Sequence, residues 1–480
     1  MNKQNLIKLN DVDNVYVSLT NSKKYKLGYK YASEDINKGQ AIIKFGRIIG
    51  YANSKIKSDA LVHVNNLLEP KNQDNSKKIP KINNHNTNTL NIDEKIHLYP
   101  NIENSWATKK CILVISNVSC VNDIIREITF KYSGYKNFDE TNIIPIIHNY
   151  GCGHVKGSKD IETIQNLIAG YIDNPNCFKY IKISLGCEDL LHFKAKENKK
   201  KLLGKFTVQN TSSKIDLISK VIQLIDTEKK KLDKLKRKKV SLSNLTVALQ
   251  CGGSDGLSSI TANPLLGKVS EILSQYKSKI IFSETPETIG LRAELLTRCK
   301  NKKLHSKLSK IFSEWEANEN EKHNPAPGNI AGGISNIFEK SLGSVMKSGN
   351  LVINDVLNYG ELVNKKNYGL FFADSPGYDP CSITGQISNG ANLILFTTGR
   401  GSSYSNSFVP VIKVSSNTFI KNKVSDIIDF DAQFNIQKFG IESSAQKLIQ
   451  LIINKFKKQK IQKKEFINSD FVPWIKESSN

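Results

Sequence analysis

The chain of 480 residues is long enough for two to four domains, whose cores need no disulfide or metal to fold. Hydrophobic residues make up 39% and charged residues 24%, which excludes a disordered or fibrous protein. No window approaches about 18 uncharged apolar residues, and the N-terminus lacks the apolar core of a signal peptide. We therefore expect a cytoplasmic globular protein without a membrane partner.

The formal net charge of +24 comes mainly from lysines, in runs such as EKKKLDKLKRKK at 228–239. A basic surface can bind phosphate polymers. No zinc-finger, aromatic-interleaved sheet or recognition-helix pattern accompanies these lysines, however. Leu232 and Leu235 within the run indicate a solvated helix with one apolar edge. We expect no nucleic-acid partner.

The first part of the chain predicts a small all-β module at 1–68. Alternating segments such as VYVSL and AIIKFGRIIGYA are separated there by the turn residues of NSKK and NKGQ. The polar stretch at 69–95, rich in Asn and Lys, is predicted to be a linker.

From residue 96 onward, apolar segments such as KKCILVIS, FKYIKISLG, LTVALQ and ANLILFTTG alternate with stretches of helix length. This pattern predicts an α/β body with mainly parallel sheets. The lysine-rich stretch near its middle divides the body into a first α/β domain at 96–235 and a second, C-terminal α/β domain at 236–480.

The eight cysteines contain no CxxC pair, which argues against a disulfide framework and a zinc ribbon. Ligands of open α/β sheets bind beyond the carboxyl ends of the strands. Cysteines in that position are candidates for metal-binding or reactive groups in one shared cleft, with core packing as the alternative. Four cysteines follow predicted strands in this way: Cys120, Cys152, Cys187 and Cys251. We expect Cys251 in a solvent-facing loop.

Other polar residues also follow predicted strands. Ser254 and Asp255 lie in a Gly-Gly-Ser-Asp-Gly loop, where Asp255 either binds substrate or caps a helix. Glu284 in SETPE is a candidate for binding a metal or a substrate hydroxyl. Arg400, between two glycines, suits a carboxylate or phosphate. His148 also follows a predicted strand, and it is a candidate metal ligand or base, with a structural polar role as the alternative.

A set of short motifs occurs in the order HNYGC, LGCE, LQCGGSDGLSSITANPLLG, SETPE, NPAPGNIAGG, EKSLG, DSPGYDP and TTGRGS. Together they closely resemble the altronate and galactarate dehydratase family, including its sulfolactate sulfo-lyase relatives. The resemblance extends from about residue 10 to beyond residue 430. It implies an N-terminal β-clip (SAF) module, a two-part α/β body and iron-dependent elimination from a sugar acid.

The reaction that the resemblance implies is the conversion of D-altronate to 2-dehydro-3-deoxy-D-gluconate. Galactarate dehydration and carbon–sulfur elimination from sulfolactate are the alternatives. A proton next to a carboxylate is weakly acidic, so a divalent cation must neutralise the developing enediolate and a side chain must remove the proton. We expect Fe²⁺ as the cofactor, with Mn²⁺ or an iron–sulfur cluster as alternatives.

Carried over by motif, the candidate residues fall into three expected roles. The expected metal ligands are Cys120, Cys152, Cys187 and Cys251. The expected catalytic residues are His63, His148 and Asp255. The expected substrate-binding residues are Asn66, Ser254, Glu284, Asn329 and Arg400. We also predict that His63 reaches the cleft of Cys251 when the β module folds over the body or over a neighbouring subunit.

Three stretches depart from the family's pattern. The β module has His63-Val64-Asn65-Asn66 where the family has His-x-His-Asn, and Ala107-Thr108-Lys109-Lys110 replaces Gly-x-Arg-Asn. Ile330 stands where the family commonly has lysine. A lysine cannot reproduce a bidentate guanidinium contact. These departures imply a different sugar acid or reduced activity, and leave a catalytically impaired sugar-acid-binding homologue as an alternative. A homo-oligomer is a further expectation.

Overall fold

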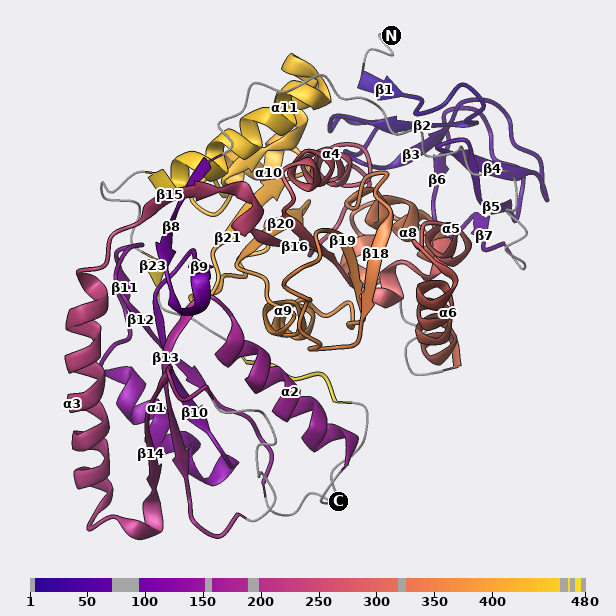
Figure 1. The fold of residues 1–480 in the computed structure, drawn as a ribbon. Helices are drawn as coiled ribbons and strands as arrows, with labels where there is room; N and C mark the ends of the chain where they lie inside the picture. The colour runs from indigo at the N-terminus through magenta and orange to yellow at the C-terminus, as the bar shows by residue number, and fades with distance from the viewer. Residues whose placement is uncertain are drawn as a thin grey trace.

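The computed structural model describes residues 5–70, 95–151, 158–188, 198–317, 325–457, 465–466 and 471–475. Figure 1 shows a β-rich N-terminal module on one side of the C-terminal α/β domain and the first α/β domain on the other. No helix of the described residues is long and apolar enough to cross a membrane.

The N-terminal module consists of two small antiparallel sheets with strand orders β1-β2-β3-β6 and β4-β5-β7. Alternate side chains, including Val15 and Val17 of β2, are buried, as the period-two pattern predicts. The strands are β1 (Leu6–Ile7), β2 (Val15–Ser18), β3 (Lys30–Ala32), β4 (Ala41–Lys44), β5 (Arg47–Ala52), β6 (Leu61–Val62) and β7 (Leu67–Leu68).

The first α/β domain is built on a four-stranded parallel sheet in the order β12-β10-β13-β14. Ile112 and Val114 of β10 pack with helices α1 and α3, whereas Leu113 and Ile115 pack with α2. Successive strand residues point to opposite faces, so the continuous apolar run CILVIS supplies both faces of this sheet.

Its elements are β8 (Lys95–Pro100), η2 (Ile102–Asn104), β9 (Trp106–Ala107), β10 (Cys111–Ser116), η3 (Ser119–Val121), α1 (Asn122–Phe130), β11 (Tyr135–Lys136), β12 (Asn142–Ile146), α2 (Lys159–Asp173), β13 (Cys177–Ser184), β14 (Leu202–Thr207), η4 (Val208–Asn210) and α3 (Lys214–Asp233).

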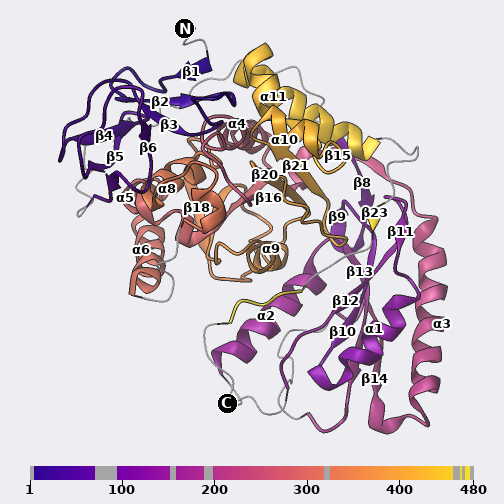
Figure 2. The same cartoon turned by 180° about the vertical axis from the view of Figure 1, so that it is seen from behind.

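The C-terminal domain has a seven-stranded parallel sheet in the order β18-β19-β17-β16-β20-β21-β22. Helices α4 and α11 pack on one face of this sheet, and α9 packs on the other together with α2 of the first domain. Helices α2 and α9 therefore form a layer between the two sheets, which can be followed from behind in Figure 2. These observations confirm the predicted fold class.

The elements of this domain are β15 (Lys238–Ser241), η5 (Leu242–Asn244), β16 (Thr246–Cys251), α4 (Ala262–Gln275), β17 (Lys279–Phe282), η6 (Thr285–Glu287), η7 (Ile289–Leu291), α5 (Arg292–Thr297), α6 (Lys302–Ala317), α7 (Pro327–Ile330), α8 (Ile337–Met346), β18 (Ile353–Leu357), β19 (Gly369–Ala373), α9 (Asp379–Ser388), β20 (Leu393–Thr398), β21 (Val411–Ser415), α10 (Thr418–Lys423), β22 (Phe430–Asp431), α11 (Ala432–Lys457) and β23 (Glu465–Phe466). Strand β15 pairs with β8, and β23 pairs with β11.

The sheet order reverses at β16, because the chain continues to β17 on one side and returns to β20 on the other. Such a reversal is where open α/β sheets bind ligands. The two loops that follow β16 and β20 are hydrogen-bonded to each other: Gly252 N donates to Thr397 O at 3.1 Å, and Gly399 N donates to Gly253 O at 3.0 Å. The fold therefore joins the CGGSDG and TTGRG motifs at the carboxyl end of the sheet.

Candidate active site

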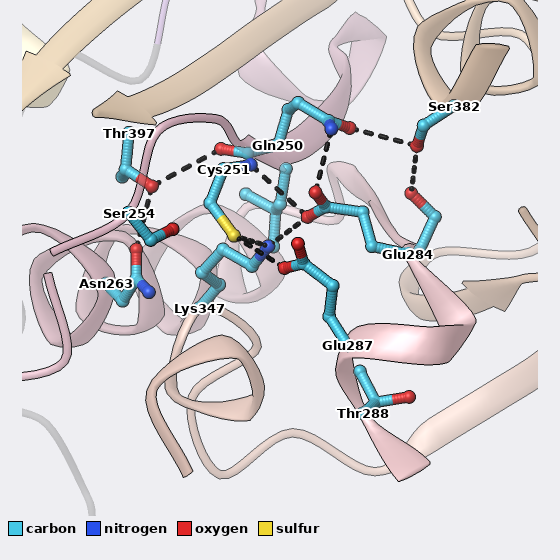
Figure 3. A network of polar contacts seen from close by, with 12 residues as sticks. Gln250, Cys251, Ser254, Asn263, Glu284, Glu287, Thr288, Lys347, Ser382 and Thr397 are labelled. Atoms are coloured by element: carbon cyan, nitrogen blue, oxygen red, sulfur yellow. Dashed lines mark hydrogen bonds and ion pairs between the residues drawn. The ribbon is translucent and has the colours of Figure 1, made fainter. Parts of the chain in front are cut away.

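Cys251 is the last residue of β16, and its side chain is buried among ionisable groups (Figure 3). Its Sγ lies 3.1 Å from Glu287 Oε2, 2.9 Å from Lys347 Nζ and 3.6 Å from Lys340 Nζ. The prediction that Cys251 lies in a solvent-facing loop is therefore wrong, because the residue is only 2% exposed. We refer to Cys251, Glu284, Glu287, Lys340 and Lys347 as the Cys251 cluster.

The two lysines of the cluster come from one face of α8. They stand about two helical turns apart, with Lys347 at the C-cap. Lys347 forms an ion pair with Glu284, and Lys340 Nζ lies 2.9 Å from Glu287 Oε2. Lys340 also donates to Ser254 Oγ at 2.8 Å. A buried charge is tolerated when it is paired in this way.

Glu284 and Glu287 come from the turn that follows β17. The backbone of Glu284 is left-handed, with φ of 69°, a conformation that costs a non-glycine residue energy. Its side chain compensates through contacts with Lys347, with Cys251 N at 3.2 Å and with Gln250 Nε2 at 2.8 Å. Gln250 Nε2 also donates to Asp379 Oδ1 at 2.8 Å. One amide thus connects Asp379 to the cluster.

The acids of this site outnumber its two lysines. Burial raises the pKa of the Cys251 thiol to about 12, that of Glu284 to about 8 and that of Asp379 to about 6. Burial alone would lower the pKa of Lys340 and Lys347, but the thiolate that Cys251 forms at high pH and the neighbouring carboxylates raise both above the ordinary lysine value. The lysines therefore stay charged, and the thiol keeps its proton at neutral pH.

Within the described ranges, one group of His, Cys, Asp and Glu side chains converges closely enough to hold a metal ion. Its donor atoms, from Cys251, Glu284 and Glu287, all lie within 4.8 Å of one another. Sulfur and carboxylate oxygen suit Fe²⁺ or Mn²⁺ in donor type, and protons held on buried acids can be exchanged for a divalent cation. The donors fit such an ion in chemistry and charge, although binding would compete with the lysine contacts.

The structure does not bring Cys120 or Cys187 to this group. Cys120 and Cys187 are exposed and follow β10 and β13 of the first α/β domain, whereas Cys251 ends a strand of the C-terminal sheet. Cysteines that follow apolar strands in similar local sequences do not come together when the strands belong to different sheets. Cys152 lies outside the described residues.

His148 lies in the first α/β domain and is buried. Its Nε2 is 3.1 Å from Ser116 O, and its Nδ1 accepts from Tyr150 N at 3.3 Å. Both ring nitrogens contact backbone, which matches the structural alternative considered for this residue.

Asp255 ties the loop after β16 to the loop after β21. Its carboxylate accepts hydrogen bonds from Ser258 N and Ser416 Oγ, both at 2.8 Å, and from Asn417 Nδ2 at 3.0 Å. The residue is buried, and a side chain at Gly399 would clash with its carboxylate. These contacts fix a turn and not a helix N-terminus, because α4 begins at Ala262 with Thr261 as its N-cap. Ser254 is the residue of this loop that reaches the Cys251 cluster.

The N-terminal module packs on the loop that precedes α8. His63 Nδ1 lies 3.1 Å from Ser335 Oγ, and Tyr29 Oη donates to Ala331 O at 2.9 Å. Arg400 Nη1 donates to the same carbonyl at 3.3 Å. The module therefore folds over the body within one chain and brings His63 and Arg400 to the same loop.

Asn329 and Asn66 are placed differently within this region. Asn329 is buried in α7, at the start of the same loop. Asn66 accepts from His63 N at 2.9 Å and donates to Leu61 O at 2.7 Å, so its amide shapes the turn that carries His63.

Lys109 and Lys110, which the sequence predicted to stand in place of an Arg-Asn pair, lie just before β10, at the amino end of its sheet. Lys109 Nζ is 3.8 Å from the centre of the Phe138 ring, and Lys110 Nζ donates to Leu232 O at 3.0 Å. Both are buried. In this structure these lysines hold elements of the body together, so their effect is on packing rather than on a substrate contact.

The sequence assigned no role to Lys340, Lys347 or Asp379, although Lys340 lies in the motif EKSLG and Asp379 in DSPGYDP. A usable signal was present. The segment IFEKSLGSVMKSG carries apolar or small residues on every side of the helix, which marks a helix buried all round. Lysines in such a helix must be paired with buried acids.

Sequence models of one family match the chain in three consecutive parts: an altronate/galactarate dehydratase SAF domain at 4–70, a D-galactarate dehydratase/altronate hydrolase second domain at 99–233, and a D-galactarate/altronate dehydratase C-terminal domain at 242–479.

Curated relatives agree with these matches. An altronate dehydratase of Escherichia coli (strain K12) is 31% identical over 440 residues, 88% of this chain and 85% of the relative. An altronate dehydratase of Bacillus subtilis (strain 168) is 29% identical, covering 89% and 90%. The galactarate dehydratase (L-threo-forming) of E. coli is 28% identical, covering 84% and 80%. With all three domains matched in order and relatives aligned over most of their length, the chain belongs to the altronate/galactarate dehydratase family of hydro-lyases.

Proposed function

We propose that the protein removes water from D-altronate to give 2-dehydro-3-deoxy-D-gluconate. The observation that carries this proposal is the buried Cys251 cluster with Asp379 beside it, at the carboxyl end of the central strand of a sugar-acid dehydratase scaffold. Two altronate dehydratases among the relatives support altronate over galactarate as the substrate.

Asp379 is the residue that we assign as the base. Its side chain is partly exposed, whereas Glu284 and Lys347 behind it are buried. With its pKa raised to about 6 by burial, Asp379 is ionised at neutral pH yet more basic than an ordinary aspartate. These are the properties required to remove the proton next to the substrate carboxylate.

The lysines and Arg400 supply positive charge around this reaction. Lys340 and Lys347 are buried on one face of α8, which places both ammonium groups before substrate arrives, so that their charge stabilises the developing enediolate. Arg400 is exposed, and among the described residues its guanidinium donates to Ala331 O alone, which leaves donors for a substrate carboxylate.

Iron remains part of the proposal, with Mn²⁺ as the alternative ion. Cys251, Glu284 and Glu287 would hold it. When bound, the ion would neutralise negative charge on the enediolate and polarise the leaving hydroxyl.

The substrate assignment is tested with anaerobically purified protein in the presence of ferrous iron. Altronate, galactarate and sulfolactate are offered separately, and 2-keto acid and sulfite are measured. We expect keto acid from altronate. Keto acid from galactarate alone, or sulfite from sulfolactate, would overturn the substrate assignment. Binding of altronate without turnover would favour a sugar-acid-binding homologue.

We expect Cys251→Ser to lower the iron bound per chain at least about tenfold, because an alcohol is a much poorer ligand for iron than a thiolate. The serine hydroxyl can still contact Lys347 and Glu287, so the protein should fold. Metal content is measured by mass spectrometry after anaerobic loading. Cys381→Ser is the matched control, since Cys381 is also buried but lies outside the donor group. Full iron occupancy in Cys251→Ser would remove this residue from the metal site.

We expect the turnover of the wild-type protein to fall about tenfold per pH unit below pH 6, because a protonated Asp379 cannot accept the substrate proton. Above pH 6 the carboxylate is ionised and this limb should be flat. The check is a pH profile of kcat at saturating altronate, recorded between pH 4.5 and 8. A profile without an acidic limb near pH 6 would exclude Asp379 as the base.

A further inference from the structure

A pocket lies at the junction between the first α/β domain and the C-terminal domain. Its volume is about 220 Å³. Trp106 and Asn198 line it from the first domain, and Ser243, Thr246, Lys279 and Leu362 line it from the C-terminal domain. Pockets at such junctions are frequent ligand sites.

This junction pocket is separate from the Cys251 cluster. Thr246 is the first residue of β16 and Lys279 the first of β17, whereas Cys251 is the last residue of β16. A six-residue strand places its ends roughly 17 Å apart. The pocket and the cluster therefore lie at opposite ends of the same central strand.

Lys279 is the residue of the junction pocket that indicates a bound anion. It is half-buried, and its ammonium group has no hydrogen bond or ion pair with any residue that the structure describes. Burial lowers the pKa of Lys279, and no carboxylate of the described residues offsets this effect. A partly buried ammonium without a counter-charge is unfavourable, so an anion in the pocket would gain a strong, charge-assisted contact.

The remaining walls indicate which kind of anion fits. Three lysines and one aspartate, Asp173, line the pocket, so its overall charge favours an anion. Trp106 and Leu362 provide an apolar wall, and Leu362 is 38% exposed. Asn198 and Ser243 provide donors and acceptors for hydroxyl groups. An inorganic ion would leave the apolar wall unused, whereas a hydroxylated carbon chain would cover it.

We propose that the junction pocket binds a small polyhydroxy carboxylate, with the carboxylate on Lys279 and the carbon chain against Trp106 and Leu362. Such a ligand would contact both α/β domains at once and so stabilise their junction. The pocket would bind it whether or not the protein turns over altronate.

Fluorine NMR of the full chain labelled with 5-fluorotryptophan tests this site directly. The sequence contains three tryptophans, and Trp106→Phe identifies the signal of Trp106. Sodium D-gluconate is the probe. We expect a saturable shift of the Trp106 signal, with an affinity at least about tenfold weaker in Lys279→Met. Lys303→Met, at an exposed lysine of α6, is the matched control and should behave as the wild type.

Several results would overturn the proposal. These are an unchanged Trp106 signal, a shift that Lys279→Met does not weaken, and an equal shift with neutral sorbitol. A shift of the same size with inorganic phosphate would show an inorganic anion site instead. If Lys279→Met does not fold, as judged by circular dichroism, Leu362→Trp provides the second variant, because the larger side chain fills the pocket and should abolish the shift.

Discussion

Glu339→Gln is expected to destabilise the protein by about 3–5 kcal/mol, because it leaves two buried ammonium groups without a counter-charge. Lys30 Nζ and Lys44 Nζ each lie 2.7 Å from one oxygen of Glu339, and all three side chains are at most 1% exposed. Lys30 and Lys44 belong to β3 and β4 of the N-terminal module, whereas Glu339 belongs to α8. This triad joins the module to the helix that carries Lys340.

Urea unfolding of the wild type and Glu339→Gln measures this effect. The matched control is Glu294→Gln, which breaks the partly exposed pair of Glu294 with Arg47 and should cost about 0–1 kcal/mol. Replacing all three triad residues by methionine should recover much of the loss, since it removes the unpaired charges. A change of less than about 1 kcal/mol in Glu339→Gln would contradict the importance of the triad.

The same triad predicts a pH dependence. Burial alone would raise the pKa of Glu339, but Lys30 and Lys44 outweigh it and lower the pKa to about 2, from an ordinary value of 4.5. A carboxyl group whose pKa is lowered on folding stabilises the protein above its unfolded pKa, and this stabilisation is lost as the pH falls. The difference in unfolding free energy between the wild type and Glu339→Gln should therefore shrink between pH 4.5 and pH 2.

Asp379→Asn is expected to lower kcat by about 10²- to 10⁴-fold, the usual contribution of a general base. The asparagine keeps the shape of the side chain and an oxygen that accepts from Gln250, so folding and KM should change little. Steady-state kinetics with altronate measure the effect, and Asp123→Asn, at an exposed residue of α1, is the matched control. A kcat within about threefold of the wild type would remove Asp379 from the chemistry.

The pH profile of kcat should also differ between the wild type and Asp379→Asn. If Asp379 is the base, the acidic limb near pH 6 disappears in Asp379→Asn together with most of the turnover. If the acidic limb of the kcat profile is unchanged in Asp379→Asn, a group other than Asp379 causes this limb.

The sequence by itself determined the fold class and the end of the sheet at which the candidate site lies. Period-two alternation marked the strands of the N-terminal module, and continuous apolar runs such as CILVIS marked strands buried on both faces. Since ligands of such sheets bind beyond the strand ends, the motifs containing Cys251, Ser254 and Glu284 could be assigned to one region from local pattern alone.

Only the tertiary structure decided which of these residues meet. Cys120 and Cys251 both follow apolar strands, but the order in which strands join sheets depends on contacts between distant segments, and the two strands belong to different sheets. The roles of Lys340 and Lys347 likewise depend on Glu284 and Glu287, which lie more than fifty residues earlier in the chain. A buried charge is stable only beside its partner, and the partner is chosen by the packing of α8 against the turn after β17, which no local sequence pattern encodes.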